Sequence, residues 1–285
     1  MKNTLKMGIV GHGFVGKATD WGFNKSVEKF VVDPKYKNTI EDLSQLCPDI
    51  IFVCVPTPMG DNGNQNSEII EEVVEKISNL LPKSIIVIKS TVLPEVLQKL
   101  KKTSQNLIYN PEFLREKHAN EDFVNSEMII FGGDRNLCEK VSTAYKNHSR
   151  CITKEHIYVD LLSASLIKYI VNTFLATKVI FFNEMNEIFR KLGTDDSWEK
   201  IVNTLSIDKR IGKSHMNIPG HDGRFGFGGA CFPKDSLALI KYAQKNQSSI
   251  EVLKAAVKVN NKIRGKYSDL DVREVEQNVS FDNKI

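Results

Sequence analysis

The stretch "KMGIVGHGFVGK", Lys6 to Lys17, decides the fold of the first half of this chain. A short apolar run leads into a glycine motif, in which Gly11, Gly13 and Gly16 have the spacing G-x-G-x-x-G. Between a strand and a helix, such glycines permit a tight turn, a close approach of the backbone to a pyrophosphate, and close packing of the helix. The motif therefore predicts a dinucleotide-binding turn. Contacts to the dinucleotide are expected from Gly11, Gly13, Phe14, Val15 and Gly16.

An acidic residue stands where this kind of site needs one. The next apolar run, "KFVVDP" at residues 29–34, contains Asp33, seventeen residues past Gly16. A carboxylate at that distance holds the ribose hydroxyls of the adenosine and disfavours the extra phosphate of NADP. NAD is therefore the expected cofactor. The further residues expected to contact it are Lys35, Pro56, Thr57, Thr91 and Lys234.

Short apolar runs alternate with helical stretches through the first 150 residues. This rhythm is typical of an α/β domain, in which helices cover both faces of a parallel sheet. We predict a Rossmann-like, doubly wound parallel sheet of six strands, followed by an all-helical domain. The strands are expected within 6–11, 29–34, 49–56, 84–91, 106–111 and 127–133, and the helices within 18–24, 40–47, 67–81 and 94–104.

The second half begins with a long helical pattern at residues 160–193, which contains no proline. A helix of this length is either a core helix or a helix shared by a dimer interface, and the pattern alone leaves both open. Further helices are expected within 197–208, 234–247 and 249–266. The predicted domains are 1–155 for NAD, 156–265 for the helical domain, and a tail, 266–285, that is mobile or packs on a partner. The residues expected to be buried along the long helix are Leu162, Leu166, Tyr169, Ile170, Phe174 and Val179.

Composition narrows the class of protein. The net charge of +4 is spread along 285 residues without a basic block, so an anionic small molecule is a simpler partner than nucleic acid. The start of the chain lacks the apolar core of a signal peptide, and the longest apolar run, residues 50–55, is too short to cross a bilayer. The five cysteines form no C-x-x-C pair and lie near no histidine cluster. We therefore expect no metal, no disulfide framework, no membrane partner and a cytoplasmic location.

Polar residues follow several of the predicted strands. Thr57 and Thr91 stand after the third and fourth strands, where ligands bind in such sheets, although a threonine there can also be a simple cap. Glu112 and Glu116 are four residues apart, so on a helix they would face one site or form a surface pair. One carboxylate could then contact substrate hydroxyls while the other acts as a base.

Two further groups supply donors and a nucleophile. Lys168 and Asn172 are four residues apart on the long helix, where they would hold a developing alkoxide or form a polar stripe. Cys231 lies in "GFGGACFPKD", Gly226 to Asp235, between flexible glycines and two opposite charges. A nearby positive charge lowers the pKa of a thiol, and Lys234 is close in sequence. Cys231 is thus either a nucleophile or a buried filler, and its neighbours favour the nucleophile.

Taken in order, seven motifs between Lys6 and about Asn261 resemble the UDP-glucose/GDP-mannose dehydrogenase family. They are "GHGFVG", "VCVPTPMGDNGNQN", "KSTV", "NPEFLREKHANEDF", "KYIVN", "DKRIG" and "GFGGACFPKD". The resemblance implies that two NAD+ oxidise the primary alcohol of a nucleotide sugar to a carboxylate, with UDP-glucose as the expected substrate. It also implies a homodimer through the long helix and a place in polysaccharide biosynthesis.

The resemblance also assigns roles to residues. Cys231 would capture the aldehyde as a thiohemiacetal, whose oxidation gives a thioester that water cleaves. Lys168 and Asn172 would stabilise oxyanions, while Asp235 would assist proton transfer or orient water. Thr91 would hold a water, and Glu116 would act as a base. The residues implied in substrate binding are Glu112, Phe113, Leu114, Lys168, Asn172, Phe225, Gly228 and, from the neighbouring subunit, Arg210.

The chain departs from the family pattern after the long helix. Typical members carry a further nucleotide-binding domain, so the means of holding the nucleotide is open. The stretch "HMNIPGHDGRFG" is longer than the usual loop, and Lys213, His215 or Arg224 are expected to replace some contacts. Two other functions compete with this one. They are a two-electron β-hydroxyacid dehydrogenase, which needs no thiol, and a cofactor-binding module without turnover.

Overall fold

The computed structural model describes residues 4–24 and 26–282, which form two compact units. Unit 1 comprises Met1–Thr57 and Asn66–Lys168, and unit 2 comprises Pro58–Gln65 and Tyr169–Ile285. The units divide inside one long helix, whereas the sequence places domain boundaries at residues 155 and 265. Those boundaries stay a prediction.

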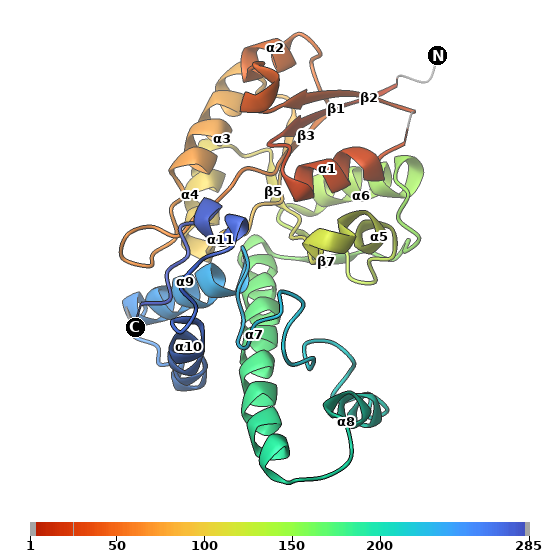
Figure 1. The fold of residues 1–285 in the computed structure, drawn as a ribbon. Helices are drawn as coiled ribbons and strands as arrows, with labels where there is room; N and C mark the ends of the chain where they lie inside the picture. Colours follow the sequence, from red (N-terminus) through yellow and green to blue (C-terminus); the bar gives the residue numbers. More distant parts are fainter. Residues whose placement is uncertain (1–3, 25, 283–285) are drawn as a thin grey trace. The chain divides into compact units, whose positions relative to one another are not determined.

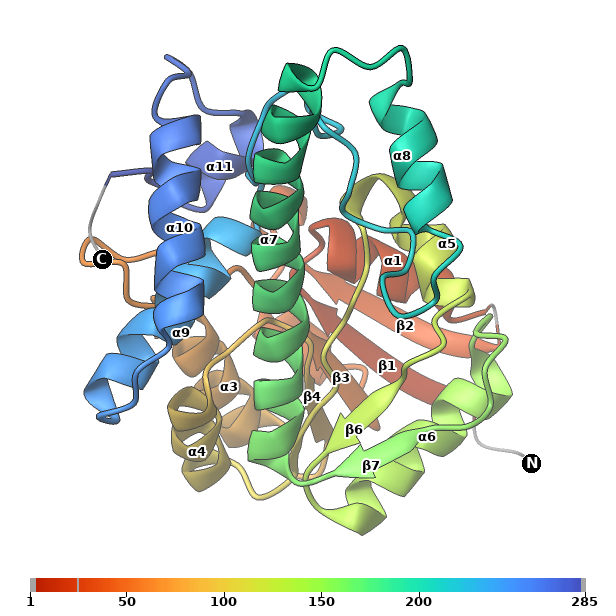
Figure 2. The ribbon, with the colours of Figure 1, turned by 90° about the horizontal axis from the view of Figure 1, so that it is seen from below.

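Unit 1 is built on one seven-stranded sheet of order β2-β1-β3-β4-β5-β6-β7 (Figures 1 and 2). All strands from β1 to β5 run parallel, but β6 pairs antiparallel with β5, and β7 is parallel to β6. The sheet is therefore mixed rather than wholly parallel, and its last strand was not predicted, because "IYV" is short and half exposed. The strands are β1 Leu5–Val10, β2 Val27–Val32, β3 Ile50–Val53, β4 Ile85–Ile88, β5 Leu107–Tyr109, β6 Ile130–Gly132 and β7 Ile157–Val159.

Helices cover both faces of this sheet, which explains why β3 and β4 read as continuous apolar runs, "IIFV" and "IIVI". Figure 1 shows α2, α3 and α4 together on one side and α1, α5 and α6 on the other. The core between sheet and α1, α5 and α6 includes Phe23, Phe52 and Phe131. The elements are α1 Phe14–Gly22, η1 Pro34–Tyr36, α2 Ile40–Ser44, α3 Glu68–Leu80, α4 Pro94–Thr103, η2 Glu116–His118, α5 Ala119–Val124 and α6 Arg135–His148.

Unit 2 is helical, as the sequence predicts. Its part of α7 (Leu161–Lys191) packs through Ala176 and Ile180 against α9 (Phe232–Lys245) and α10 (Glu251–Arg264). Phe182 of α7 packs instead with Val202 of α8 (Trp198–Leu205). A short last helix, α11 (Val272–Glu276), completes the unit.

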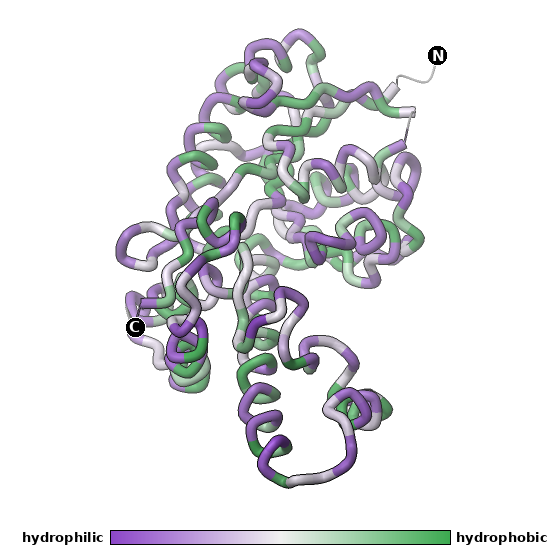
Figure 3. Tube along the Cα trace, viewed as in Figure 1, coloured by the Kyte–Doolittle hydropathy of each residue, from purple (hydrophilic) through white to green (hydrophobic). Residues whose placement is uncertain are grey.

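The burial predicted along α7 is correct only in part. Tyr169 is fully buried, and Leu162 and Val179 are half-buried. Leu166, Ile170 and Phe174 are instead 45%, 53% and 64% exposed, so their predicted burial is wrong. The apolar residues of α7 reach beyond the faces that other helices of the chain cover. Figure 3 shows hydrophobic and hydrophilic residues alternating along this helix. Among the described residues, α7 is also the one helix whose length and hydropathy would allow it to cross a membrane.

Over its described residues, the tail carries a short helix and buried side chains, whereas the sequence predicts a segment that is mobile or packs on a partner. Asp271 and Glu274 form a capping box at the start of α11, and Glu274 is fully buried. Val279 is also buried. Sequence periodicity missed this packing because the tail is anchored by a buried charge rather than by an apolar stripe.

Candidate active site

The glycine turn of unit 1 has the geometry that a dinucleotide requires. Gly11 has φ +89°, a conformation that favours glycine, and its N–H donates to the Val32 carbonyl at 2.8 Å. A Cβ on Gly16 would lie 2.0 Å from the Gly11 oxygen, so only glycine lets α1 approach the turn. Gly13 has open space where its Cβ would point and gives α1 no side-chain cap. The helix N-terminus is therefore available to a phosphate.

Asp33 is held at the end of β2 by two backbone donors. Its carboxylate accepts from His12 N at 2.6 Å and from Lys35 N at 3.1 Å. Burial raises the pKa of this carboxyl, but the two hydrogen bonds and the Lys35 charge outweigh it, so the net pKa is lowered. Asp33 is thus ionised at neutral pH, as a group that holds ribose hydroxyls should be. The Lys35 ammonium also donates to the His12 carbonyl at 2.8 Å, which ties the glycine turn to β2.

His12 is a member of this cluster that the sequence pattern could not identify, because the second position of G-x-G-x-x-G accepts any residue. Its ring nitrogens lie 2.8 Å from the Tyr36 hydroxyl and 3.3 Å from the Asp20 carboxylate. The open Gly13, the uncapped α1 and the ionised Asp33 together fit a dinucleotide. In the described residues, no group of three His, Cys, Asp or Glu could hold a metal ion.

The remaining cofactor candidates of unit 1 lie at the carboxyl ends of β3 and β4. Pro56 is exposed just after β3. The Thr57 hydroxyl is buried and donates to the Thr91 carbonyl at 2.8 Å, so it links the two loops. Both threonines therefore lie together at the edge where ligands bind in such sheets.

Glu112 and Lys168 form a buried ion pair in unit 1. Lys168 Nζ lies 3.3 Å from Glu112 Oε1 and also donates to the Glu112 carbonyl. The other carboxylate oxygen accepts from Leu114 N at 2.6 Å, and the ammonium lies 5.1 Å from the centre of the Phe113 ring. The "EFL" segment thus surrounds the Lys168 ammonium from several sides.

The condition for a shared helical face of Glu112 and Glu116 is not met, because no helix joins the two residues. Residues 111–115 have no regular secondary structure, and the 3₁₀ turn η2 begins only at Glu116. Glu112 is buried whereas Glu116 is exposed.

Lys89 is a buried cation near Glu112 that sequence reasoning missed. Its ammonium donates to Asn110 Oδ1 at 2.9 Å and lies 3.4 Å from the Tyr145 hydroxyl. Burial lowers the pKa of Lys89, while the charge of Glu112 opposes this shift. A small cavity beside it is lined by both Lys89 and Glu112. The signal was a lysine directly after the all-apolar strand β4.

The polar groups of unit 2 converge on Asp235, which is fully buried. Asn172 Nδ2 donates to one carboxylate oxygen at 2.7 Å, and Lys234 Nζ donates to the other at 2.7 Å. The Asp235 carboxylate partly neutralises the Lys234 ammonium. The predicted influence of this ammonium on the Cys231 thiol is therefore weaker than that of an isolated charge. The network joins α7 to the first turn of α9.

Cys231 is the N-cap residue of α9, half-buried, and its carbonyl accepts the helical bond from Asp235 N at 2.9 Å. The N-terminal end of a helix favours an anion, so this position suits a thiolate. The loop before it is built on glycine, since Gly226 and Gly229 have φ +75° and +78°. None of the five cysteines, all within the described residues, forms a disulfide.

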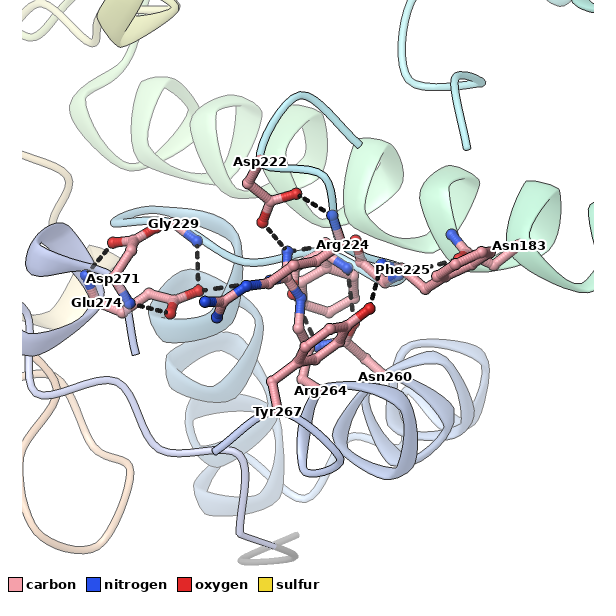
Figure 4. Close-up of polar contacts among 12 residues, drawn as sticks. Asn183, Asp222, Arg224, Phe225, Gly229, Asn260, Arg264, Tyr267, Asp271 and Glu274 are labelled. Carbon is pink, nitrogen blue, oxygen red and sulfur yellow. Dashed lines mark hydrogen bonds and ion pairs between the residues drawn. The ribbon is translucent and has the colours of Figure 1, made fainter. Parts of the chain in front are cut away.

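The other predicted substrate residues lie in or beside the loops of unit 2. Arg210 is exposed, and its Nε lies 2.9 Å from an Asp208 oxygen. Phe225 is half-buried, and its N–H donates to the Tyr267 hydroxyl at 2.9 Å (Figure 4). Arg224 binds Asp269 at 2.8 Å, so it ties the loop to the segment after α10. Of the other two loop candidates, Lys213 is exposed, and the His215 ring packs on Phe232.

Similarity to known proteins agrees with this arrangement. Residues 24–149 match the NAD binding domain of the UDP-glucose/GDP-mannose dehydrogenase family, and residues 162–262 match its central domain. The UDP-glucose 6-dehydrogenase of Rickettsia felis is 35% identical over 221 residues, 74% of this chain and 47% of that protein. The chain spans about half the length of the curated relatives it matches.

Two solved structures share the fold. The structure of a UDP-glucose dehydrogenase from Pyrobaculum islandicum has a TM-score of 0.75 at 24% identity, over 92% of this chain and 69% of that one. A 3-hydroxyisobutyrate dehydrogenase from Mycobacterium tuberculosis has a TM-score of 0.68 at 15% identity, over 94% and 96%. The two matched family domains, together with the glycine turn before them, decide the assignment: this chain belongs to the UDP-glucose/GDP-mannose dehydrogenase family.

Proposed function

We propose that this chain is an NAD-dependent UDP-glucose 6-dehydrogenase, which oxidises the primary alcohol of the sugar to a carboxylate through a covalent thioester. The observation that carries the proposal is Cys231 at the N-terminus of α9, one helical turn before the buried Asp235. The named relatives support UDP-glucose as the substrate. The overall change is one alcohol and one water to one carboxylic acid, with four electrons leaving as two hydrides.

The nucleotide cofactor supplies the hydride acceptor for both oxidations, held by Gly11, Gly13, Phe14, Val15 and Gly16 at the turn and by Asp33 and Lys35 at the ribose. Pro56, Thr57, Thr91 and Lys234 are the remaining contacts proposed for it. The chain's own chemistry begins with the aldehyde. Cys231 Sγ adds to the carbonyl carbon, which gives a thiohemiacetal, and loss of a second hydride gives a thioester. Water then cleaves the carbon–sulfur bond and returns the thiol.

Two donors on α7 are proposed to stabilise the oxyanions of these steps. Lys168 and Asn172 are one turn apart on the same face of the helix. An asparagine amide has two N–H donors, and Asn172 uses one of them on Asp235, which leaves the other for substrate. Asp235 thereby fixes the orientation of the amide and can orient water. Thr91 is proposed to hold a water and Glu116 to act as base in thioester hydrolysis.

Substrate contacts are proposed for residues of each unit. Glu112, Phe113 and Leu114 contribute from unit 1, and Phe225 and Gly228 from unit 2. Arg210 is exposed and extends from its loop, which suits a contact to the substrate of a neighbouring subunit. A homodimer through α7 would cover the exposed apolar stripe of Leu166, Ile170 and Phe174.

We also propose a cytoplasmic location and a role in supplying uronic acid for polysaccharides. None of the five cysteines forms a disulfide, which supports a reducing compartment. Buried polar residues on α7, among them Asn183 and Asn186, support a helix packed against protein rather than lipid.

The test is a panel of sugar nucleotides, with NADH counted by absorbance and the product identified. The proposal predicts two NADH for each molecule of UDP-glucose consumed. One NADH per molecule, with a keto product from a β-hydroxyacid, would instead support the alternative that the 3-hydroxyisobutyrate dehydrogenase fold suggests. If the protein bound NAD+ but formed NADH with no substrate of the panel, the result would support a cofactor-binding module without turnover.

A further inference from the structure

The loop before Cys231 is held by one side chain from each of three helices. Asn183 of α7 accepts from Gly226 N at 2.9 Å. Asn260 of α10 accepts from Phe227 N at 2.7 Å and donates to the Phe227 carbonyl at 3.0 Å. Glu274 of α11 accepts from Gly229 N at 3.0 Å. Figure 4 shows these contacts along the extended loop, and the Glu274 contact is the one nearest to Cys231 in the chain.

Both carboxylate oxygens of Glu274 accept hydrogen bonds from backbone N–H groups. Its Oε1 receives the Gly229 N–H, and its Oε2 accepts from Asp271 N at 2.9 Å in the capping box of α11. The side chain is fully buried. A buried carboxylate is costly unless it is hydrogen-bonded and paired with a cation.

The cation is Arg264, the last residue of α10. Its Nη1 lies 4.0 Å from Glu274 Oε1, and its Nη2 donates to Asp222 Oδ2 at 2.6 Å. Among the described residues, Nη1 and Nε have no hydrogen-bond partner, so the guanidinium serves the two carboxylates. Arg264 therefore connects the start of the glycine-rich loop, through Asp222, to α11.

The absence of a side chain at Gly228 makes this arrangement possible. A Cβ there would lie 2.3 Å from Glu274 Oε1 and 2.6 Å from Arg264 Nη2. At Gly229, by contrast, an added Cβ would meet no atom within 4 Å outside the neighbouring residues of the chain. Because glycine also has wide backbone freedom, the hydrogen bond that the Gly229 N–H donates to Glu274 restrains the Gly229 peptide.

We propose that Glu274 is a positioning residue for Cys231. By fixing the Gly229 peptide two residues before the thiol, it sets the direction in which Sγ points from the N-terminus of α9. Arg264 offsets part of the carboxylate's charge, and the effect that we propose on the thiol is geometric. This inference rests on the proposed thioester function only for its effect on turnover. Its effect on the thiol itself is separate.

The test compares Glu274→Ala with Glu276→Ala in the full chain. Glu276 is exposed on the same helix and pairs with Arg273, so it is a matched control. Position-resolved alkylation by iodoacetamide reports the accessibility of Cys231, with exposed Cys47 as the reference and buried Cys138 as the check on folding. Trp198 fluorescence reports the integrity of unit 2, because its indole donates to the Met216 carbonyl at 3.0 Å.

Loss of the restraint should expose the thiol and misdirect it. Glu274→Ala is expected to raise the Cys231 alkylation rate by about threefold or more and to lower kcat by about tenfold or more, since small misplacements of a reacting group cost this much. The KM for NAD+, the Cys47 rate and the Trp198 signal should not change. Glu274→Gln keeps an acceptor for Gly229 N and should show a smaller change in the same directions.

If Cys231 in a folded Glu274→Ala variant were alkylated at the same rate as in wild type, the proposal would be overturned. If that variant does not fold, Glu274→Met, which fills a similar volume without an acceptor for Gly229 N, decides, and an unchanged Cys231 rate there overturns it equally. Uronate production by a Cys231→Ala variant would refute the proposed thioester function instead. The alkylation result would still stand, so the two failures are distinguishable.

Discussion

Asn172 Nδ2 donates a 2.7 Å hydrogen bond to Asp235 Oδ2, which joins the helix of the proposed oxyanion donors to the helix that begins at Cys231. The carboxylate is fully buried, and its other oxygen holds the Lys234 ammonium. Asp235 is thus the centre of the polar network in unit 2. Its charge, and not only its shape, should matter to both stability and turnover.

Replacement of Asp235 by Asn should leave the Lys234 charge without its carboxylate partner. Breaking a buried ion pair in this way costs about 3–5 kcal/mol of unfolding free energy. Urea unfolding measures the loss. Asp196→Asn is the control, because it breaks an exposed pair with Lys200 and should cost about 0.5 kcal/mol or less. Equal losses in the two variants would contradict the importance of the buried network.

Removal of the Lys168 ammonium should lower the turnover number, kcat. Lys168→Met is expected to lower kcat with UDP-glucose by about 10²- to 10³-fold, as the loss of one oxyanion donor does. The KM for NAD+ should change little. Lys191→Met is the control, since Lys191 lies on the same helix in an exposed pair with Glu187. A Lys168→Met enzyme with the wild-type kcat would remove this residue from the mechanism.

Asp33 should determine both the affinity for NAD+ and the choice against NADP+. Asp33→Asn removes charged hydrogen bonds worth about 1.5–3 kcal/mol, so the Kd for NAD+ should rise at least about tenfold while discrimination against NADP+ falls. Titration calorimetry measures both, with the exposed Glu28→Gln as control. Because the pKa of Asp33 is lowered, affinity in the wild type should be retained from pH 7 to pH 5. Unchanged NAD+ affinity in Asp33→Asn would contradict the assigned site.

His156 should make unit 1 less stable in mild acid. Burial, with the Lys146 and Lys154 charges, lowers its pKa from 6.5 to about 4, so the folded state favours the neutral ring. The unfolded chain binds the proton first as the pH falls below 6.5, and about 2–3 kcal/mol of stability should be lost between pH 6.5 and pH 4.

Urea unfolding across this range tests the assignment to His156. A His156→Phe variant keeps the aromatic contact to Phe131 and should show a flatter dependence on pH. His118→Phe should not differ from wild type, because His118 is exposed. If the free energy of unfolding depended equally on pH in wild type, His156→Phe and His118→Phe, the role of His156 would be contradicted.

Local signals account for the parts of the fold and site that the sequence predicted. The glycine turn, Asp33, the parallel strands and the spacing of Lys168 and Asn172 depend on residues near one another in the chain. Periodicity also located α7 and most of α9, although α9 begins at Phe232, two residues before the predicted start. These features follow from backbone geometry and need no knowledge of tertiary contacts.

Features that depend on distant partners could not be predicted. The antiparallel β6 and the short β7 are decided by pairing across the sheet edge. Exposure of Ile170 and Phe174 on α7 depends on which faces the other helices cover. Glu274 looked like one charge in a polar tail because Gly229 and Arg264, which bury it, lie elsewhere in the sequence.

The central claim is that Cys231 forms a covalent bond to the substrate. The most direct measurement counts NADH and uronate formed from UDP-glucose by wild type, Cys231→Ala and the control Cys47→Ala, whose thiol is exposed in unit 1. Wild type and Cys47→Ala should give two NADH for each uronate, and Cys231→Ala should give no uronate. Uronate from Cys231→Ala at a rate near that of wild type would contradict the covalent role.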